Sequence, residues 1–200
     1  MELNAFPSLR RLDISKLFFG RRLSLPPSLV ELRFHKCAIG PICDLVRLHE
    51  LNPTLPELRS LILSETPMKM RTIRKFLTAT PSLELLHIDG CTELDNPLTP
   101  VLLNVGSFRN LVELDISGAK GVMDLDMRFL IVGLTRLKIL NLSHTNITWV
   151  TVKMLADRRE MHGEHPNLDC LYVEGCGEVT SDCVEYAQAR GIEIRKSSLI

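Results

Sequence analysis

The nine residues Leu111-Val-Glu-Leu114-Asp-Ile116-Ser-Gly-Ala119 contain the pattern that decides the fold of this chain. Two leucines three positions apart are followed, two positions later, by another apolar residue. Seven copies of this phrase, L-x-x-L-x-(I/L/F/V), span Leu9–Ile14, Leu29–Phe34, Leu58–Leu63, Leu83–Ile88, Leu111–Ile116, Leu137–Leu142 and Leu168–Val173. Their second leucines lie 20, 29, 25, 28, 26 and 31 residues apart, so the chain is built from repeats.

This period is typical of leucine-rich repeats. The short L-x-L segment of each copy is expected to form a strand, because alternate side chains of a strand point to opposite faces. Stacked repeats place these strands in parallel, and their leucines share one core. We therefore predict an α/β fold: a leucine-rich-repeat solenoid, or horseshoe, with a parallel β-sheet on the concave face and helices on the convex face.

The segments between the strands are expected to form the convex helices. Apolar residues at helical spacing predict helices over 69–79, 124–133, 149–159 and 180–190, a short one over 43–50, and a late or short one over 96–105. The first connection contains Pro26-Pro27 and is expected to be non-helical. The side chains expected to face the core are Met70, Ile73, Phe76, Leu77, Leu125, Phe129, Leu130, Val132, Trp149, Val152, Leu155 and Ala156.

Residues 1–200 are expected to form a single domain of about seven repeats, because no linker interrupts the array. Ile192-Glu-Ile194 and the polar residues after it predict a C-terminal capping half-repeat near 192–200. Only Met1 to Pro7 precede the first repeat, so we expect the chain to be a piece of a longer protein.

Composition narrows the class of partner. The 24 basic and 24 acidic residues cancel, which gives no electrostatic reason to expect nucleic acid or an anionic membrane as the main partner. No secretory pattern opens the chain, and its six cysteines are scattered. These features predict a reducing compartment, cytoplasmic or nuclear.

A second repeated position supports the frame of the repeats. If the first leucine of each copy is position one, position nine is expected to turn inward. It holds Leu17, Cys37, Thr66, Cys91, Ala119, Thr145 and Cys176. Through His35-Lys-Cys37, Asp89-Gly-Cys91 and Glu174-Gly-Cys176, the chain resembles the intracellular cysteine-containing subfamily of leucine-rich-repeat proteins.

That resemblance implies a substrate-recognition subunit of a cullin-type ubiquitin ligase, as in F-box/leucine-rich-repeat and Zer/Zyg-type receptors. The chain departs from these receptors because it has no non-repeat segment long enough for an F-box and no elongin-binding box. An adaptor-binding region would therefore lie outside it. A structural or assembly scaffold without a ubiquitin link is the alternative.

The side chains expected on the concave face occupy positions three, five, seven and eight. Their formal charge per repeat runs +1, +1, −1, −1, −2, 0 and −1, which would steer a basic segment toward Asp89, Glu113 and Asp115. A solvated face with an unselected charge distribution is the alternative. The residues predicted to bind a protein or peptide are Arg11, Asp13, Arg33, His35, Ile62, Ser64, Leu85, His87, Asp89, Glu113, Asp115, Ile139, Asn141, His144, Tyr172 and Glu174. Among these we expect exposed Ile62, Leu85, Ile139 and Tyr172 to be apolar anchors.

We expect no catalytic, cofactor or metal site. The motif His162-Gly-Glu-His165 precedes Pro166 in the longest connection, where a surface loop is favoured over a zinc site. Serines, histidines and aspartates of the concave face could form a triad on paper. An open surface, however, lacks the oxyanion hole and dry pocket that a hydrolase needs.

Overall fold

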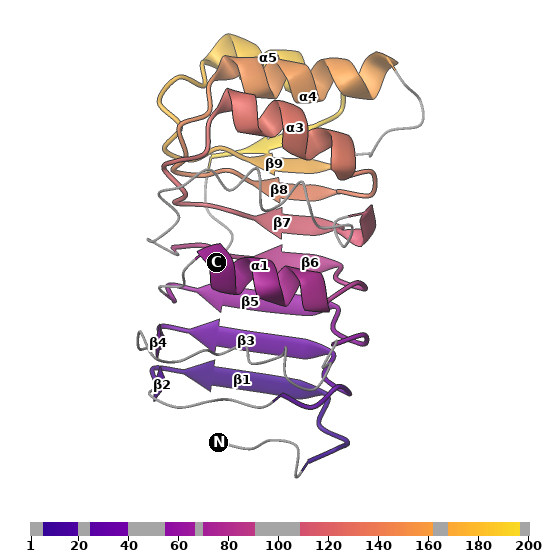
Figure 1. The fold of residues 1–200 in the computed structure, drawn as a ribbon. Coiled ribbons are helices and arrows are strands. Elements are labelled where there is room, and N and C mark those ends of the chain that lie inside the picture. Colours follow the sequence, from indigo (N-terminus) through magenta and orange to yellow (C-terminus); the bar gives the residue numbers. More distant parts are fainter. Residues whose placement is uncertain are drawn as a thin grey trace.

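The computed structural model describes residues 6–19, 25–39, 55–66, 70–90, 109–161 and 168–196. Its main element is an all-parallel eight-stranded sheet whose strands follow one another in chain order (Figure 1). The strands are β1 Arg11–Ser15, β3 Glu31–His35, β5 Ser60–Ser64, β6 Leu85–His87, β7 Glu113–Asp115, β8 Ile139–Asn141, β9 Cys170–Tyr172 and β10 Glu193–Arg195. Two short strands, β2 Phe18–Phe19 and β4 Ala38–Ile39, pair in a separate sheet.

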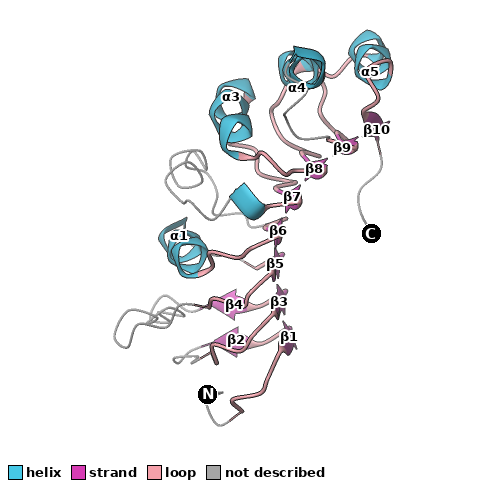
Figure 2. Ribbon diagram, turned by 90° about the vertical axis from the view of Figure 1, so that its right-hand side faces the viewer, coloured by secondary structure: helices cyan, strands magenta, loops and turns pink. Residues whose placement is uncertain are grey.

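The helices lie along one face of the large sheet and leave its other face open, as Figure 2 shows. They are α1 Met70–Ala79, α3 Asp124–Gly133, α4 Trp149–Met161 and α5 Ser181–Gln188. The helix predicted over 124–133 is confirmed with its bounds, and the other three deviate by one or two residues. The helices predicted over 43–50 and 96–105 lie outside the described residues.

The strand register follows the repeat frame read from the sequence. The second leucines of the seven phrases pair in one row across the sheet, from Leu12 with Leu32 to Leu140 with Leu171. Ile194 of β10 continues this row beside Leu171. The parallel α/β architecture is therefore confirmed, and it is compatible with a leucine-rich-repeat solenoid.

The core lies between the sheet and the helices. Strand side chains at positions four and six are buried from Leu32 onward, and Leu12 at the first strand is partly buried. The prediction for α1 is confirmed for Ile73, Phe76 and Leu77, which are fully buried. Each such side chain contributes roughly 1.5–3 kcal/mol through its removal from water.

The inward face predicted for α3 is confirmed for Leu130 and wrong for the other three residues. Leu125, Phe129 and Val132 are exposed, whereas Leu130 and its neighbours Met127 and Ile131 are buried. The helix carries two apolar stripes, and periodicity alone does not select the one that meets the sheet.

The same correction applies to Trp149, which is exposed at the first residue of α4. The other three predicted residues of that helix, Val152, Leu155 and Ala156, are buried as expected. No helix in the described parts of the chain has the length and apolar character needed to cross a membrane.

A tight corner follows each of the first seven strands of the large sheet. Position eight has a positive φ in all seven repeats, between 46° and 76°, a left-handed conformation that favours glycine. Three of these positions are Gly90, Gly118 and Gly175; the others are Lys16, Lys36, Glu65 and His144.

Position nine follows this corner and turns inward, as predicted, at Cys37, Thr66, Ala119, Thr145 and Cys176. The prediction is wrong for Leu17, which is exposed, and Cys91 lies outside the described residues. The thiol of Cys37 donates to the carbonyl of Ile14 at 3.3 Å, and that of Cys176 donates to the carbonyl of Leu142 at 3.1 Å. Each cysteine thus joins its repeat to the preceding one.

Candidate functional site

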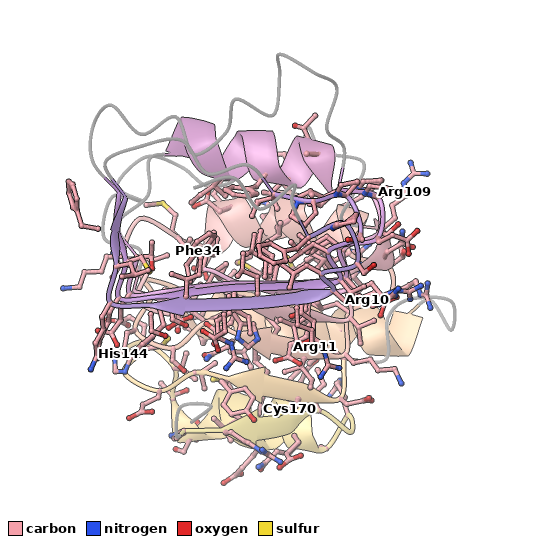
Figure 3. All side chains as sticks on the ribbon, turned by 90° about the horizontal axis from the view of Figure 1, so that it is seen from below. Arg10, Arg11, Phe34, Arg109, His144 and Cys170 are labelled. Carbon is pink, nitrogen blue, oxygen red and sulfur yellow. The ribbon has the colours of Figure 1, made fainter. Side chains whose placement is uncertain are left out.

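The face of the sheet that the helices leave open carries the predicted binding residues. In Figure 3, Phe34 lies on the helix side of the sheet, and Arg11 and Cys170 lie on the opposite side. Positions three, five and seven share this opposite side because a strand alternates its side chains. We call it the concave face.

The N-terminal third of the concave face contains a shallow depression of about 300 Å³. Its lining includes the charged side chains Arg11, Asp13, Glu31 and Arg33 and the half-buried Ile62 of β5. Arg11 lies 3.2 Å from Glu31, and Arg33 lies 3.8 Å from Asp13. These charges alternate between neighbouring strands, so the depression combines local polarity with little net charge.

The predicted basic excess at this end comes from Lys16 and Lys36. Lys36 lies 3.2 Å from Glu65 of the next repeat, which adds a third ion pair to those of Arg11 and Arg33 and compensates part of this excess. All three ion pairs are solvent-exposed, so each contributes little to folding stability. Charged groups of a binding partner can therefore replace these pairings at a small cost in free energy.

The centre of the concave face holds a titratable pair. The Nε2 of His87 lies 2.7 Å from the Glu113 carboxylate, and both side chains are mostly buried. Burial lowers the pKa of His87, but its hydrogen bond to the Glu113 carboxylate and the charges of Asp115, Glu113 and Asp89 outweigh burial and raise the pKa above its ordinary value. The Ser64 hydroxyl donates to Asp89 at 2.8 Å, and half-buried Leu85 lies on the same strand as His87.

Toward the C-terminal end of the concave face, polar side chains are hydrogen-bonded within the sheet. The Asn141 amide donates to the Asp115 carboxylate at 2.7 Å, and backbone amides of Ser117 and Ser143 donate to these two side chains. Only 5% of Asp115 and 1% of Asn141 is accessible. Both residues are therefore buried, not accessible as we expected, because hydrogen bonds within and between their repeats already satisfy these polar groups.

Tyr172 requires the same correction, since 3% of it is accessible and it is not an exposed anchor. Its hydroxyl accepts a hydrogen bond from Arg195 of β10 at 2.8 Å. Burial raises the pKa of this phenol. Arg195 was not among the predicted residues, because the last strand lacks the leucine phrase that set the frame.

The remaining predicted residues are spread along the sheet. His35 and Ile139 are half-buried on β3 and β8, His144 is exposed at the corner after β8, and Glu174 is half-buried just before the corner residue Gly175 that follows β9. The structure thus gathers Arg11, Asp13, Arg33 and Ile62 in the depression and Ser64, Leu85, His87, Asp89 and Glu113 in the centre.

The hydrolase and metal-site alternatives concern the same kinds of side chain. His87 is paired with Glu113 rather than with a serine, so the triad drawn on paper is not assembled around it. Among the described residues, no three His, Cys, Asp or Glu side chains are grouped to hold a metal ion. The His162–His165 motif, Cys43 and Cys91 lie outside those residues.

A second hollow, on the helix side, was not predicted from the sequence. It has a volume of about 220 Å³ and lies between α4 and α5. Trp149, Lys153, Cys183 and Tyr186 contribute to its lining, and the Tyr186 hydroxyl donates to Asp157. The only signal for it was the pair of aromatic residues, one on each helix.

Comparison with known proteins shows no family for this chain. No family model matches it, and no curated protein matches it. Among solved structures, it is similar to a chain from the crystal structure of the Rad7 and Elc1 complex in yeast. The two share 16% sequence identity with a TM-score of 0.45, and the match covers 88% of this chain and 68% of that chain.

Proposed function

We propose that this chain is a non-enzymatic protein-interaction module that binds a protein or peptide on the concave face between β1 and β6. The depression over β1, β3 and β5 carries this proposal, since it combines exposed charges with the half-buried Ile62. Apolar anchors surrounded by a polar rim are usual at protein interfaces.

The proposed binding surface is limited to β1 to β6 because polar side chains on β7, β8 and β9 are hydrogen-bonded within the sheet. Asp115, Asn141 and Tyr172 are buried and bonded to their neighbours. A partner would have to break these bonds to use them, whereas the exposed pairs of β1 and β3 exchange at small cost.

The more specific proposal is a leucine-rich-repeat horseshoe that acts as a substrate-recognition subunit of a cullin-type ubiquitin ligase, in the cytoplasm or nucleus. It rests on the resemblance to the cysteine-containing subfamily, and the buried position-nine residues Cys37 and Cys176 support that resemblance. The ligase adaptor would bind a region outside this chain. No cofactor, nucleic acid or membrane enters this proposal.

An assembly scaffold without a ubiquitin link is the second candidate. The exposed apolar residues Leu125, Phe129 and Val132 of α3 favour it, because they offer a second surface on the convex side. Recovery of cullin subunits with the full-length gene product would support the ligase role, and their absence would support the scaffold.

Affinity purification with mass spectrometry tests the concave site. The test variant is Ile62→Glu with Leu85→Glu, and the matched control is Leu125→Glu on α3. Glutamate at the centre of an interface costs about 2 kcal/mol or more, or roughly thirtyfold in affinity. We expect the test variant to lose partners that the wild type and the control retain. If it retains them all, the concave site is wrong.

A further inference from the structure

Strand β1 forms one edge of the large sheet and, within the described residues, pairs with β3 alone. The Lys16 amide donates to the carbonyl of His35, and the carbonyl of Arg10 accepts the amide of Glu31. Residues of a parallel strand direct their backbone groups alternately to either side. The N–H and C=O groups of Arg11, Asp13 and Ser15 therefore point away from the sheet, toward an added strand.

Exposed apolar side chains surround this edge. Phe6 before β1 is 59% accessible, and Leu17 and Phe18 after it are 51% and 71% accessible. Leu12, within β1, is only partly buried. A strand edge flanked by apolar groups in this way is a surface for association with another chain.

The charges of β1 select the partner and the register. An antiparallel copy of β1 centred on Leu12 places Arg11 opposite Asp13 of the other copy, twice because of the two-fold symmetry. Two other symmetric alignments also pair residues whose backbone groups point away from the sheet. One is centred on Arg11 and places Arg11 opposite Arg11, and the other is centred on Asp13 and places Asp13 opposite Asp13. Like charges directly opposite each other are unfavourable, so the edge is complementary to itself in the first register.

We propose that two copies of the 200-residue chain, in which β1 is the edge of the described sheet, associate through antiparallel pairing of their β1 strands, with Leu12 on the two-fold axis. The Arg11 guanidinium, already 3.2 Å from Glu31, meets Asp13 of the second copy, whose carboxylate lies 3.8 Å from its own Arg33. On each side of the axis, Glu31 and Arg11 of one copy and Asp13 and Arg33 of the other then form a row of four charges of alternating sign across the interface. The two concave faces join into one surface, whatever partner they bind.

Sedimentation velocity of the 200-residue chain tests this interface. We expect a species of twice the 22.6 kDa chain mass at protein concentrations up to about 100 μM. Arg11→Asp and Asp13→Arg each place like charges opposite one another and are expected to raise the dissociation constant about tenfold or more. The control, Glu185→Arg on the exposed side of α5, keeps the dimer. Circular dichroism melts confirm that each variant is folded.

An equimolar mixture of Arg11→Asp and Asp13→Arg separates this interface from a general effect of charge. In the mixed dimer, each altered residue faces an opposite charge, so the dimer is expected to return. Lost pairing with Glu31 or Arg33 cannot explain that recovery, because each chain keeps its own substitution. A monomeric wild type, a dimer indifferent to both substitutions, or a mixture that stays monomeric would overturn the proposal.

Discussion

Replacement of Gly175 by alanine tests the tight corner that follows the strand of each repeat. Gly175 has a φ of +67°, and a β-carbon added there would lie 2.2 Å from Nδ1 of His144 in the neighbouring repeat. Gly118 has a similar φ of +76°, but its β-carbon would meet nothing closer than 3.7 Å. The two glycines therefore separate the cost of a left-handed backbone from the cost of a steric contact.

The magnitudes follow from this geometry. Alanine in the left-handed region costs about 1–2 kcal/mol, part of which is offset by the lower entropy of its unfolded state, so Gly118→Ala should cost about 1 kcal/mol. At Gly175 the exposed His144 ring must also leave its position, which adds about 1 kcal/mol. Each kcal/mol lowers the Tm of a domain of this size by roughly 2–4 °C.

Urea and thermal unfolding of Gly118→Ala, Gly175→Ala, His144→Gly and the 144/175 double variant form the assay. His144→Gly removes the obstructing ring, so it should reduce the cost of Gly175→Ala to that of Gly118→Ala. Equal costs at the two glycines, or additive effects in the double variant, would refute the proposed contact.

Two further predictions concern pH and hydrogen bonding. The raised pKa of His87 means that its pairing with Glu113 stabilises the fold fully below pH 6.5 and is lost as pH rises through the folded pKa. The wild-type free energy of unfolding should therefore fall as the pH rises above about 6.5, the unfolded pKa of histidine. His87→Gln should remove this slope in urea titrations, and an unchanged slope would contradict the pairing. The Asp124 carboxylate accepts hydrogen bonds from the Thr148 amide and from the hydroxyls of Thr148 and Thr151, at 2.9, 2.7 and 2.6 Å. Asp124→Ala should lower the free energy of unfolding by about 2 kcal/mol in the same assay. The control Asp169→Ala removes an exposed carboxylate and should lower it little. Equal losses for the two variants would show that these hydrogen bonds do not join α3 to α4.

The register of the sheet could be predicted because the leucine phrase marks the same two inward positions in every repeat. A shift of one residue would turn every leucine outward, so hydrophobic burial permits a single alignment. The observed pairing of Leu61 with Leu86 and of Leu86 with Leu114 follows it. The helix over 124–133 was predictable for a related reason, since its apolar residues are dense enough to define its length.

The faces of the helices and the accessibility of concave residues could not be predicted to the same degree. In α3, Leu125 and Phe129 form one apolar stripe and Met127 and Ile131 form another, and only packing against the sheet selects between them. Asp115 has the charge expected of a binding residue, yet its carboxylate accepts hydrogen bonds from the Ser117 amide of its own repeat and from Asn141 of the next strand, and the sequence alone does not show these partners. The burial of a polar side chain depends on such hydrogen-bond partners, whereas the burial of an apolar side chain depends mainly on its position in the repeat.

A photoreactive phenylalanine analogue placed at Ile62 on β5, and separately at Leu125 on α3, tests the concave site most directly. After purification with the partner recovered by affinity capture, illumination joins that partner covalently to whichever residue it contacts. We expect a crosslinked product from position 62 and none from position 125. Crosslinking from position 125 alone would place the partner on the helices and contradict binding on the concave face.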